Sequence, residues 1–269
     1  MSNELYHYGI KGMKWGVRRY QNTDGSLTER GKQRYRDDDI VVRKGETVEH
    51  ISPNNNLKLK GNTPTYGYTN AYDAAVYRGR YAQYLTSQKN ASQINAYHFN
   101  AKKDIVAPSA KRTEELFYEM YKKNPEMVKK GLRVEFNYQQ SKGRIDKKYS
   151  YEDVCDDPSK LYGVFKKNIN GYFLSMSLHD KRALSSEAYQ ASKEFVKELG
   201  NKKYNAMLDI NDVGSFYGAK EPMIVINGKH YLKKMEIEKI PSDDILVYCG
   251  VIDRLGAANK QNPDDKLFD

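Results

Sequence analysis

The first 36 residues constrain the organisation of this chain most, because they hold too few aliphatic side chains to contribute to a hydrophobic core. They contain eight Lys and Arg residues against three Asp and Glu residues, a net charge of +5, half of the +10 carried by all 269 residues. They also contain the single tryptophan, Trp15. We therefore expect residues 1–36 to form a basic arm, residues 37–256 one domain, and residues 257–269 a loose polar tail.

The arm has the composition of a binding segment. Trp and Arg are enriched at the positions that dominate protein interfaces, and Trp15, Arg18 and Arg19 lie close together here. We expect these three residues to contact a partner protein, although packing of Trp15 against the parent domain is also open. The sequence pI of about 9.2 permits nucleic acid as a second class of partner. A solvated Lys-rich surface explains the same charge more simply.

A longer pattern runs through the arm. His7 and Gly9 precede Lys-Gly-Met-Lys-Trp-Gly at 11–16, Arg-Arg-Tyr-Gln at 18–21 and Asp-Gly-Ser-Leu-Thr at 24–28. In this pattern the arm resembles the leader of a family of phage and prophage proteins from Gram-positive bacteria. The resemblance implies a phage-encoded protein of the virion or of head assembly, found in the bacterial host cytoplasm or in the virion. It implies a phage structural protein or a host protein as partner, and no particular chemistry.

Four further features limit the class of protein. Cys155 and Cys249 are the only cysteines and form no CxxC motif, which fits a reducing cytoplasm. The chain has no apolar run of the ~20 residues that a membrane span needs, so we expect no membrane partner. Asp209, Asn211 and Asp212 lack the further acids of a calcium loop and predict a turn held by their own side chains. The five histidines lack zinc-site spacing, and we expect no metal.

Hydrophobic periodicity predicts an α+β domain with a mixed or antiparallel sheet and flanking helices. Helices are expected over residues 70–88, 111–123 and 185–199, with Gly200 as a left-handed cap. Strands are expected at residues 40–43, 94–99, 204–210, 221–227, 235–240 and 245–251, with Asn227-Gly228 as a hairpin turn. Residues 52–67 and 137–160 have the composition of loops, and residues 171–177 fit either a strand or a turn of helix.

The order of these elements places polar residues at their ends. Arg43 ends the first strand, Tyr68 and Thr69 precede a helix, and Glu221 opens a late strand. In this order the chain resembles, over roughly residues 40–250, the ADP-ribosyltransferase fold of the arginine, serine-threonine-serine, glutamate class. The resemblance implies NAD as cofactor, with Arg43 on its phosphate, Thr69 and Tyr68 at the nicotinamide pocket, and Glu221 as the catalytic carboxylate that stabilises positive charge on the ribose.

The chain departs from that family at two points. Tyr68-Thr69-Asn70 stands where the family has Ser-Thr-Ser, and Ala219 stands two residues before Glu221, where active members usually have Glu or Gln. These departures leave enzymatic activity open. Two rival functions are a structural or assembly protein without catalysis, and a phage effector that inhibits a host protein by binding to it.

The same residues also allow purely structural roles. Arg43 could pair with Glu46 or Asp39, Thr69 could help to cap a helix, and Glu221 could be a loop carboxylate. A working transferase instead needs Arg43 and Glu221 on adjoining strands that face one pocket. That pocket should be ringed by tyrosines, with Tyr66, Tyr68 and Tyr72 as the candidates, because nicotinamide and adenine stack on aromatic faces.

Overall fold

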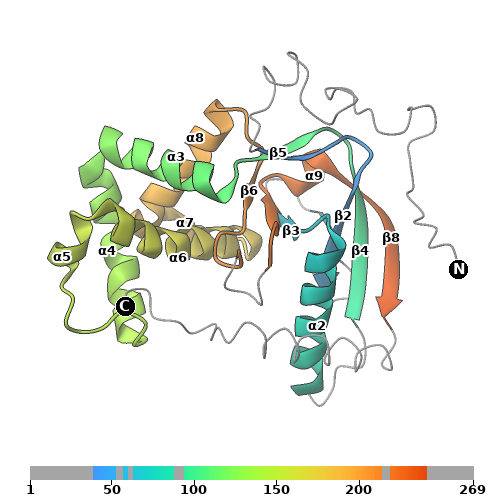
Figure 1. Ribbon diagram of the computed structural model, residues 1–269, viewed down its shortest axis with the longest axis horizontal. Coiled ribbons are helices and arrows are strands. Elements are labelled where there is room, and N and C mark those ends of the chain that lie inside the picture. The colour runs from blue at the N-terminus through green and yellow to red at the C-terminus, as the bar shows by residue number, and fades with distance from the viewer. Residues whose placement is uncertain (1–38, 53–56, 60–62, 88–93, 214–218, 241–269) are drawn as a thin grey trace, which may run out of the picture.

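A computed structural model of the chain describes residues 39–52, 57–59, 63–87, 94–213 and 219–240, with the backbone alone for residues 80 and 82–87. The expected arm with Trp15, Arg18 and Arg19, the expected strand at residues 245–251 and the polar tail lie outside these ranges. Within them, helices gather on one side of the domain, and short strands with one long helix form the other (Figure 1).

The strands of the described residues form three small sheets. The order is β2-β4-β8 in the first sheet, β3-β7-β6 in the second and β1-β5 in the third, and every pair of these strands is antiparallel. The α+β class with antiparallel sheets is therefore confirmed. The strands are β1 (Ile40–Val42), β2 (Thr47–Ser52), β3 (Thr65–Gly67), β4 (Ile94–Ala101), β5 (Ile105–Ala107), β6 (Ala206–Leu208), β7 (Met223–Val225) and β8 (Leu232–Ile240).

Most of the described helices begin at a side chain that accepts a hydrogen bond from the first turn, whereas α8 has no such cap. Ser109 caps α3 and Asn124 caps α4, whereas Asp157 caps α6, which has a proline as its first residue. The helices are α2 (Ala71–Ser87), α3 (Ala110–Lys123), α4 (Pro125–Ser141), α5 (Tyr151–Cys155), α6 (Pro158–Ser177), α7 (Lys181–Ser185), a 3-10 turn (Glu187–Tyr189), α8 (Gln190–Asn201) and α9 (Gly228–Tyr231).

Helix α6 is the centre of the helical half. The ring of Phe165 lies 4.7 Å from that of Phe117 on α3 and 4.9 Å from that of Phe195 on α8, measured between ring centroids. All three side chains are buried. Aromatic contacts of this kind add to the stability that burial of their surface provides, so this cluster fixes α6 and with it the residues at its C-terminal end.

The expectation of a loop at residues 137–160 is wrong. Helix α4 extends to residue 141, α5 starts at the capping box of Ser150 and Asp153, and α6 follows. Ile145 and Val154 are buried in the helical core between charged neighbours. Because these two apolar residues are nine positions apart in an otherwise polar segment, the sequence shows no hydrophobic periodicity there.

Residues 171–177 are the last two turns of α6, so the helical alternative is correct. The prediction of Gly200 as the left-handed cap is wrong, because α8 continues through it. The left-handed residue is Lys203, with φ 68°. The amide of Lys203 donates to the carbonyl of Gly200 and that of Tyr204 to the carbonyl of Leu199, which is the Schellman motif placed three residues later.

The hairpin predicted at Asn227-Gly228 is also wrong. Asn227 caps the short helix α9, accepting a hydrogen bond from the amide of His230 at 3.2 Å. This helix joins β7 to β8, which belong to different sheets. The loop predicted at residues 52–67 includes strand β3, whose partner β7 is distant in the sequence. Helix α2 and strands β1, β4, β6, β7 and β8 lie where the periodicity predicts them.

Candidate functional site

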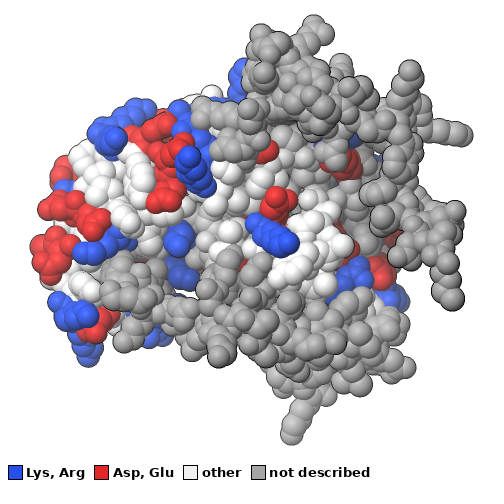
Figure 2. Space-filling model, viewed as in Figure 1, with Lys and Arg blue, Asp and Glu red and all other residues white. Residues whose placement is uncertain are grey.

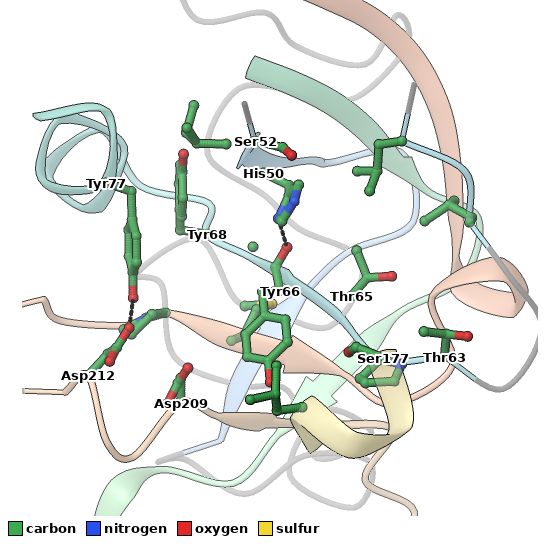
Figure 3. A pocket seen from close by; sticks show the side chains of 18 of the residues that line it. His50, Ser52, Thr63, Thr65, Tyr66, Tyr68, Tyr77, Ser177, Asp209 and Asp212 are labelled. Atoms are coloured by element: carbon green, nitrogen blue, oxygen red, sulfur yellow. Dashed lines mark hydrogen bonds between the residues drawn. The ribbon is translucent and has the colours of Figure 1, made fainter. Parts of the chain in front are cut away.

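A cleft of about 1090 Å³ opens where β2, β3, α2, the turn after β6 and the end of α6 meet (Figure 3). Its size is that of pockets that hold small organic ligands. Four tyrosines and two aspartates distinguish its wall. The described residues that line the cleft include these with polar side chains: Tyr66, Tyr68, Tyr77, Tyr81, Asp209, Asp212, His50, Ser52, Lys58, Asn170 and Ser177.

Strand β3 and helix α2 bring the tyrosines to one place. Tyr66 on β3 and Tyr68 just after it extend to opposite sides of the backbone, with the Tyr68 ring beside α2 and the Tyr66 ring toward Asp209 (Figure 3). Tyr77 and Tyr81 are four residues apart on α2 and share a face of that helix. The rings of Tyr68 and Tyr77 stack with centroids 5.0 Å apart and planes 5° apart.

The close approach of β3 to β2 requires a residue without a side chain. Gly67 lies between the two tyrosines, and a Cβ atom there would come within 2.5 Å of Val48 Cγ1 and 2.9 Å of the Glu49 carbonyl oxygen. Glu49 and Tyr68 exchange backbone hydrogen bonds of 2.8 and 3.0 Å across this contact. Any larger residue at position 67 would push the tyrosine wall away from β2.

The two carboxylates come from the turn that follows β6. The amide of Asn211 donates to Asp209 Oδ1 at 3.3 Å, which confirms the predicted turn held by its own side chains. The Asn211 side chain also donates to the carbonyl of Lys166 on α6 at 2.7 Å. Asp212 Oδ2 accepts a hydrogen bond of 2.7 Å from the Tyr77 hydroxyl (Figure 3). The turn is thus tied to both helices that border the cleft.

Burial changes the titration of these groups. Burial, and next the charge of Asp212, raise the pKa of Asp209 to about 7. Burial, followed by the nearby carboxylates, also raises the pKa of Tyr66 and of Tyr77 well above that of a free phenol. Both phenols therefore keep their protons at neutral pH. Near pH 7 the carboxyl group of Asp209 is therefore only partly ionised.

His50 is a neutral acceptor at the opposite wall. Its Nδ1 lies 2.9 Å from the Tyr66 carbonyl oxygen, which can only accept, so Nδ1 carries the proton. Burial lowers the pKa of His50 to about 4, against a smaller opposing effect of that hydrogen bond. At neutral pH its Nε2 is therefore unprotonated and can accept a hydrogen bond.

An ion-pair network holds the tyrosine wall from behind. Arg78 on α2 donates to both oxygens of Glu49 on β2, at 2.9 and 3.0 Å, and to Glu238 on β8 at 2.8 Å. Glu49 also accepts the Tyr68 hydroxyl at 3.2 Å, and His98 lies 3.3 Å from Glu238. Arg78 and Glu49 have only 13% of their side-chain surface exposed. The network joins four elements, α2, β2, β4 and β8, and fixes the Tyr68 ring.

The residues predicted from the ADP-ribosyltransferase resemblance do not gather in this cleft. Tyr68 lines it, whereas Arg43, Thr69 and Glu221 are not among its described lining residues. Arg43 follows β1, where its amide donates to Glu46 at 2.8 Å and its guanidinium lies 3.8 Å from Asp104. Their predicted roles stay predictions.

Glu221 and Thr69 are both exposed. The amides of Lys220 and Glu221 each donate to the buried carboxylate of Asp73 at 2.8 Å, which anchors the start of β7 to α2. Asn70, and not Thr69, caps α2, since its side chain accepts the amide of Asp73. Strand β1 pairs with β5, and β7 lies between β3 and β6, so the strands next to Arg43 and Glu221 are not hydrogen-bonded neighbours.

Sequence reasoning missed His50, Tyr77 and the role of the acid pair. A signal was present for Tyr77 and for the acid pair. Tyr77 lies four residues before Tyr81 on α2, so the two rings share a face of that helix. Asp209 and Asp212 follow an apolar strand directly, but only the tertiary contact of the turn with α2 and α6 turns them into a cleft wall.

Acidic and basic side chains on the surface of the helical half form ion pairs with one another. On the face seen in Figure 2, acidic and basic side chains alternate over the helices. Lys123 lies 3.0 Å from Glu198 and Lys202 lies 2.8 Å from Glu119. A mixed surface of this kind favours the solvated-surface explanation of the Lys content over a nucleic-acid site on that face.

Comparison with known proteins gives one match. The model of a family of unknown function, DUF7211, matches residues 1–22, which include Trp15, Arg18 and Arg19 but none of the residues that line the cleft. No curated protein and no solved structure matches the chain. Within the described ranges, no helix is long and apolar enough to cross a bilayer, and no group of three His, Cys, Asp or Glu residues is placed to hold a metal ion.

Proposed function

We propose that this domain binds a small molecule that contains a flat ring, and that the ring lies in the tyrosine-lined cleft. The observation that carries the proposal is the convergence of Tyr66, Tyr68, Tyr77 and Tyr81 on one cleft of about 1090 Å³. Aromatic faces stack with flat rings. The cleft wall also offers hydrogen-bonding groups that could fix the orientation of such a ligand, since His50 presents an acceptor at neutral pH.

Ring binding can be tested with a matched pair of tyrosine variants. Tyr66→Leu removes a ring from the cleft wall, whereas Tyr138→Leu removes an exposed ring of α4 that does not line the cleft. Calorimetry with nicotinamide, its 1-methyl cation and NAD should show binding by the unmodified protein, unchanged binding by Tyr138→Leu, and at least tenfold weaker binding by Tyr66→Leu. Equal affinities in the two variants would refute ring binding in this cleft.

NAD-dependent ADP-ribosyl transfer is a second candidate function. It is supported by Tyr66 and Tyr68 in the cleft wall, two of the tyrosines expected to ring an NAD pocket, whereas Arg43 and Glu221 are not among the described lining residues. In this reaction the bond from ribose C1′ to the nicotinamide nitrogen breaks, and nicotinamide leaves with the electron pair. The nucleophile of an acceptor then bonds to C1′ and loses its proton.

The catalytic carboxylate of such a reaction has two candidates. Glu221 is the residue that the resemblance implies, while Asp209 and Asp212 are the carboxylates that line the cleft. Release of nicotinamide from NAD should be measured for Glu221→Gln and Asp212→Asn. If only Glu221→Gln loses nicotinamide release, the catalytic carboxylate is the one that the resemblance implies. If only Asp212→Asn loses it, the catalytic carboxylate lies in the turn after β6. If the unmodified protein releases no nicotinamide at millimolar NAD, the transferase function is refuted. The rival functions, a structural protein or an effector that acts by binding, then remain.

We also propose that the arm docks to a phage structural protein or a host protein through Trp15, Arg18 and Arg19. Support comes from the family match, which is confined to residues 1–22. Pull-down from prophage-induced cells should recover a partner with the full chain and lose it with Trp15→Ala. Equal recovery would refute the docking role, and binding that falls steeply with salt would identify nucleic acid instead.

A further inference from the structure

We propose that the cleft selects a flat ring that carries a positive charge, and that Asp209 and Asp212 recognise this charge. The inference rests on the proposed function, since it names the class of ring that the cleft takes. The class is that of aromatic cations such as a pyridinium ring. Neither residue has a role in the family resemblance, which places its carboxylate at Glu221.

The first argument is the geometry of the acid pair. Asp209 is 5% exposed, and one turn brings it and Asp212 to the same wall (Figure 3). Two neighbouring carboxylates in a poorly solvated place repel each other. A cation that enters the cleft relieves this repulsion and replaces the solvation that burial has removed. The pair therefore favours a positive ligand over a neutral one of the same shape.

The second argument is the character of the tyrosine rings. The face of an aromatic ring is negative and attracts a cation within about 6 Å of its centre. Tyr77 donates its hydroxyl hydrogen to Asp212 at 2.7 Å, so that one carboxylate and one ring are coupled in the same wall. The Tyr68 ring stacks on that of Tyr77. Aromatic faces and carboxylates at one wall are the two groups that recognise organic cations.

The third argument is the charge of the described lining. Asp209 and Asp212 bring negative charge and Lys58 brings one positive charge, while His50 is neutral because its pKa is about 4. Lys167 on α6 acts on the acid pair but is not among the described lining residues. No guanidinium is among these described lining residues. An anionic group such as a diphosphate gains little from this wall. If NAD is the ligand, its positively charged ring fits the acid pair and its diphosphate lies away from it.

The test uses two rings of one shape. Nicotinamide is neutral, and 1-methylnicotinamide carries a positive charge on the same ring. Calorimetry with the full chain should show the charged ring binding at least tenfold more tightly, about 1.4 kcal/mol. Asp212→Asn should reduce this ratio toward one, while Asp156→Asn, which neutralises an exposed carboxylate beyond the end of α5, should preserve it. Circular dichroism shows whether each variant is folded.

The outcomes separate the inference from the proposed function. Equal binding of both rings by the unmodified protein overturns the inference and leaves ring binding intact. Binding of neither ring and of no NAD refutes the proposed function itself. Should N-acetylarginine amide bind more tightly than 1-methylnicotinamide, the cleft recognises a guanidinium, and the assignment to a ring cation is overturned. If Asp212→Asn does not fold, Asp209→Asn provides the same comparison.

Discussion

The helical half and the cleft are built by different forces. Phe117, Phe165 and Phe195 lie fully buried among apolar neighbours, and their contacts need only shape and area. The cleft depends on Arg78, on the turn at Asp209 and on short strands of three residues. Apolar packing tolerates many sequences of similar volume, whereas a polar network depends on particular partners. The helical half therefore supports the domain through apolar packing, whereas the cleft wall depends on particular polar contacts.

The largest expected effect lies in the helical half. Phe165→Ala should lower the free energy of unfolding by about 3–5 kcal/mol, because it removes a ring from the centre of a closed core. Leu178→Ala, at a residue that is 70% exposed just beyond α6, should change it by less than about 0.5 kcal/mol. Urea denaturation monitored by circular dichroism measures both. A small effect of Phe165→Ala would show that α6 is not the centre of the core.

A smaller but selective effect is expected behind the cleft. Arg78→Met should cost about 1–3 kcal/mol, since it leaves Glu49 without its bidentate partner in a mostly buried position. It should also weaken ring binding, because Glu49 holds the Tyr68 hydroxyl. Lys129→Met, which removes a pair with the exposed Asp156, is the matched control for stability and should leave ring affinity unchanged. Loss of stability without loss of affinity would separate the network from the cleft.

The acid pair predicts a dependence of stability on pH. The pKa of Asp209 rises from an ordinary 3.8 to about 7 on folding, so the folded state holds a proton that the unfolded state loses. Its contribution to stability should therefore fall as pH rises from about 4 to about 7. The charged or titratable groups that interact with it are Asp212, Lys167, Tyr66 and Tyr77.

Asp209→Asn isolates this contribution. The free energy of unfolding of the variant minus that of the parent should be measured at pH 4 and at pH 8. This difference should be about 1–3 kcal/mol more favourable to the variant at pH 8 than at pH 4. Comparison with the parent at each pH removes the opposite trend of His50, whose lowered pKa makes stability fall as pH drops from about 6.5 to about 4. A difference in unfolding free energy that does not change with pH would contradict a raised pKa at Asp209.

The smallest effect is expected from removal of the arm. Deletion of residues 1–36 should change the free energy of unfolding by less than about 0.5 kcal/mol, because this segment has few aliphatic residues for a core. The same deletion should abolish partner capture in a pull-down. Differential scanning calorimetry of the two chains provides the measurement. A lost cooperative transition after deletion would show that the arm belongs to the folded domain.

Local patterns predicted the parts of the fold that local physics determines. The α2 helix follows from its cap at Asn70 and from apolar residues at helical spacing, and β4 follows from alternation between residues 94 and 99. The segment at residues 137–160 was misjudged because Ile145 and Val154 are isolated among charges. Their burial depends on α4 and α6 packing around them, which no local pattern contains.

The candidate site shows the same limit. Tyr66 and Tyr68 were predicted as pocket residues and both line the cleft, whereas Tyr72, predicted with them, is not among its described lining residues. Asp209 and Asp212 were predicted as a turn, which is correct, but not as part of a cleft. The missing information was long-range: the Tyr77 hydroxyl reaches Asp212 across 135 positions of the chain. Contacts at that separation follow from the assembled fold and not from spacing.

The most direct test of ring binding in the cleft is a structure of the full chain, determined from crystals soaked with 1-methylnicotinamide or NAD. The ring should lie in the cleft against Tyr66 or Tyr68, with its positive nitrogen nearer to Asp209 and Asp212 than to Lys58. A ring bound elsewhere on the protein, or a cleft that stays empty at millimolar ligand, would contradict the proposal.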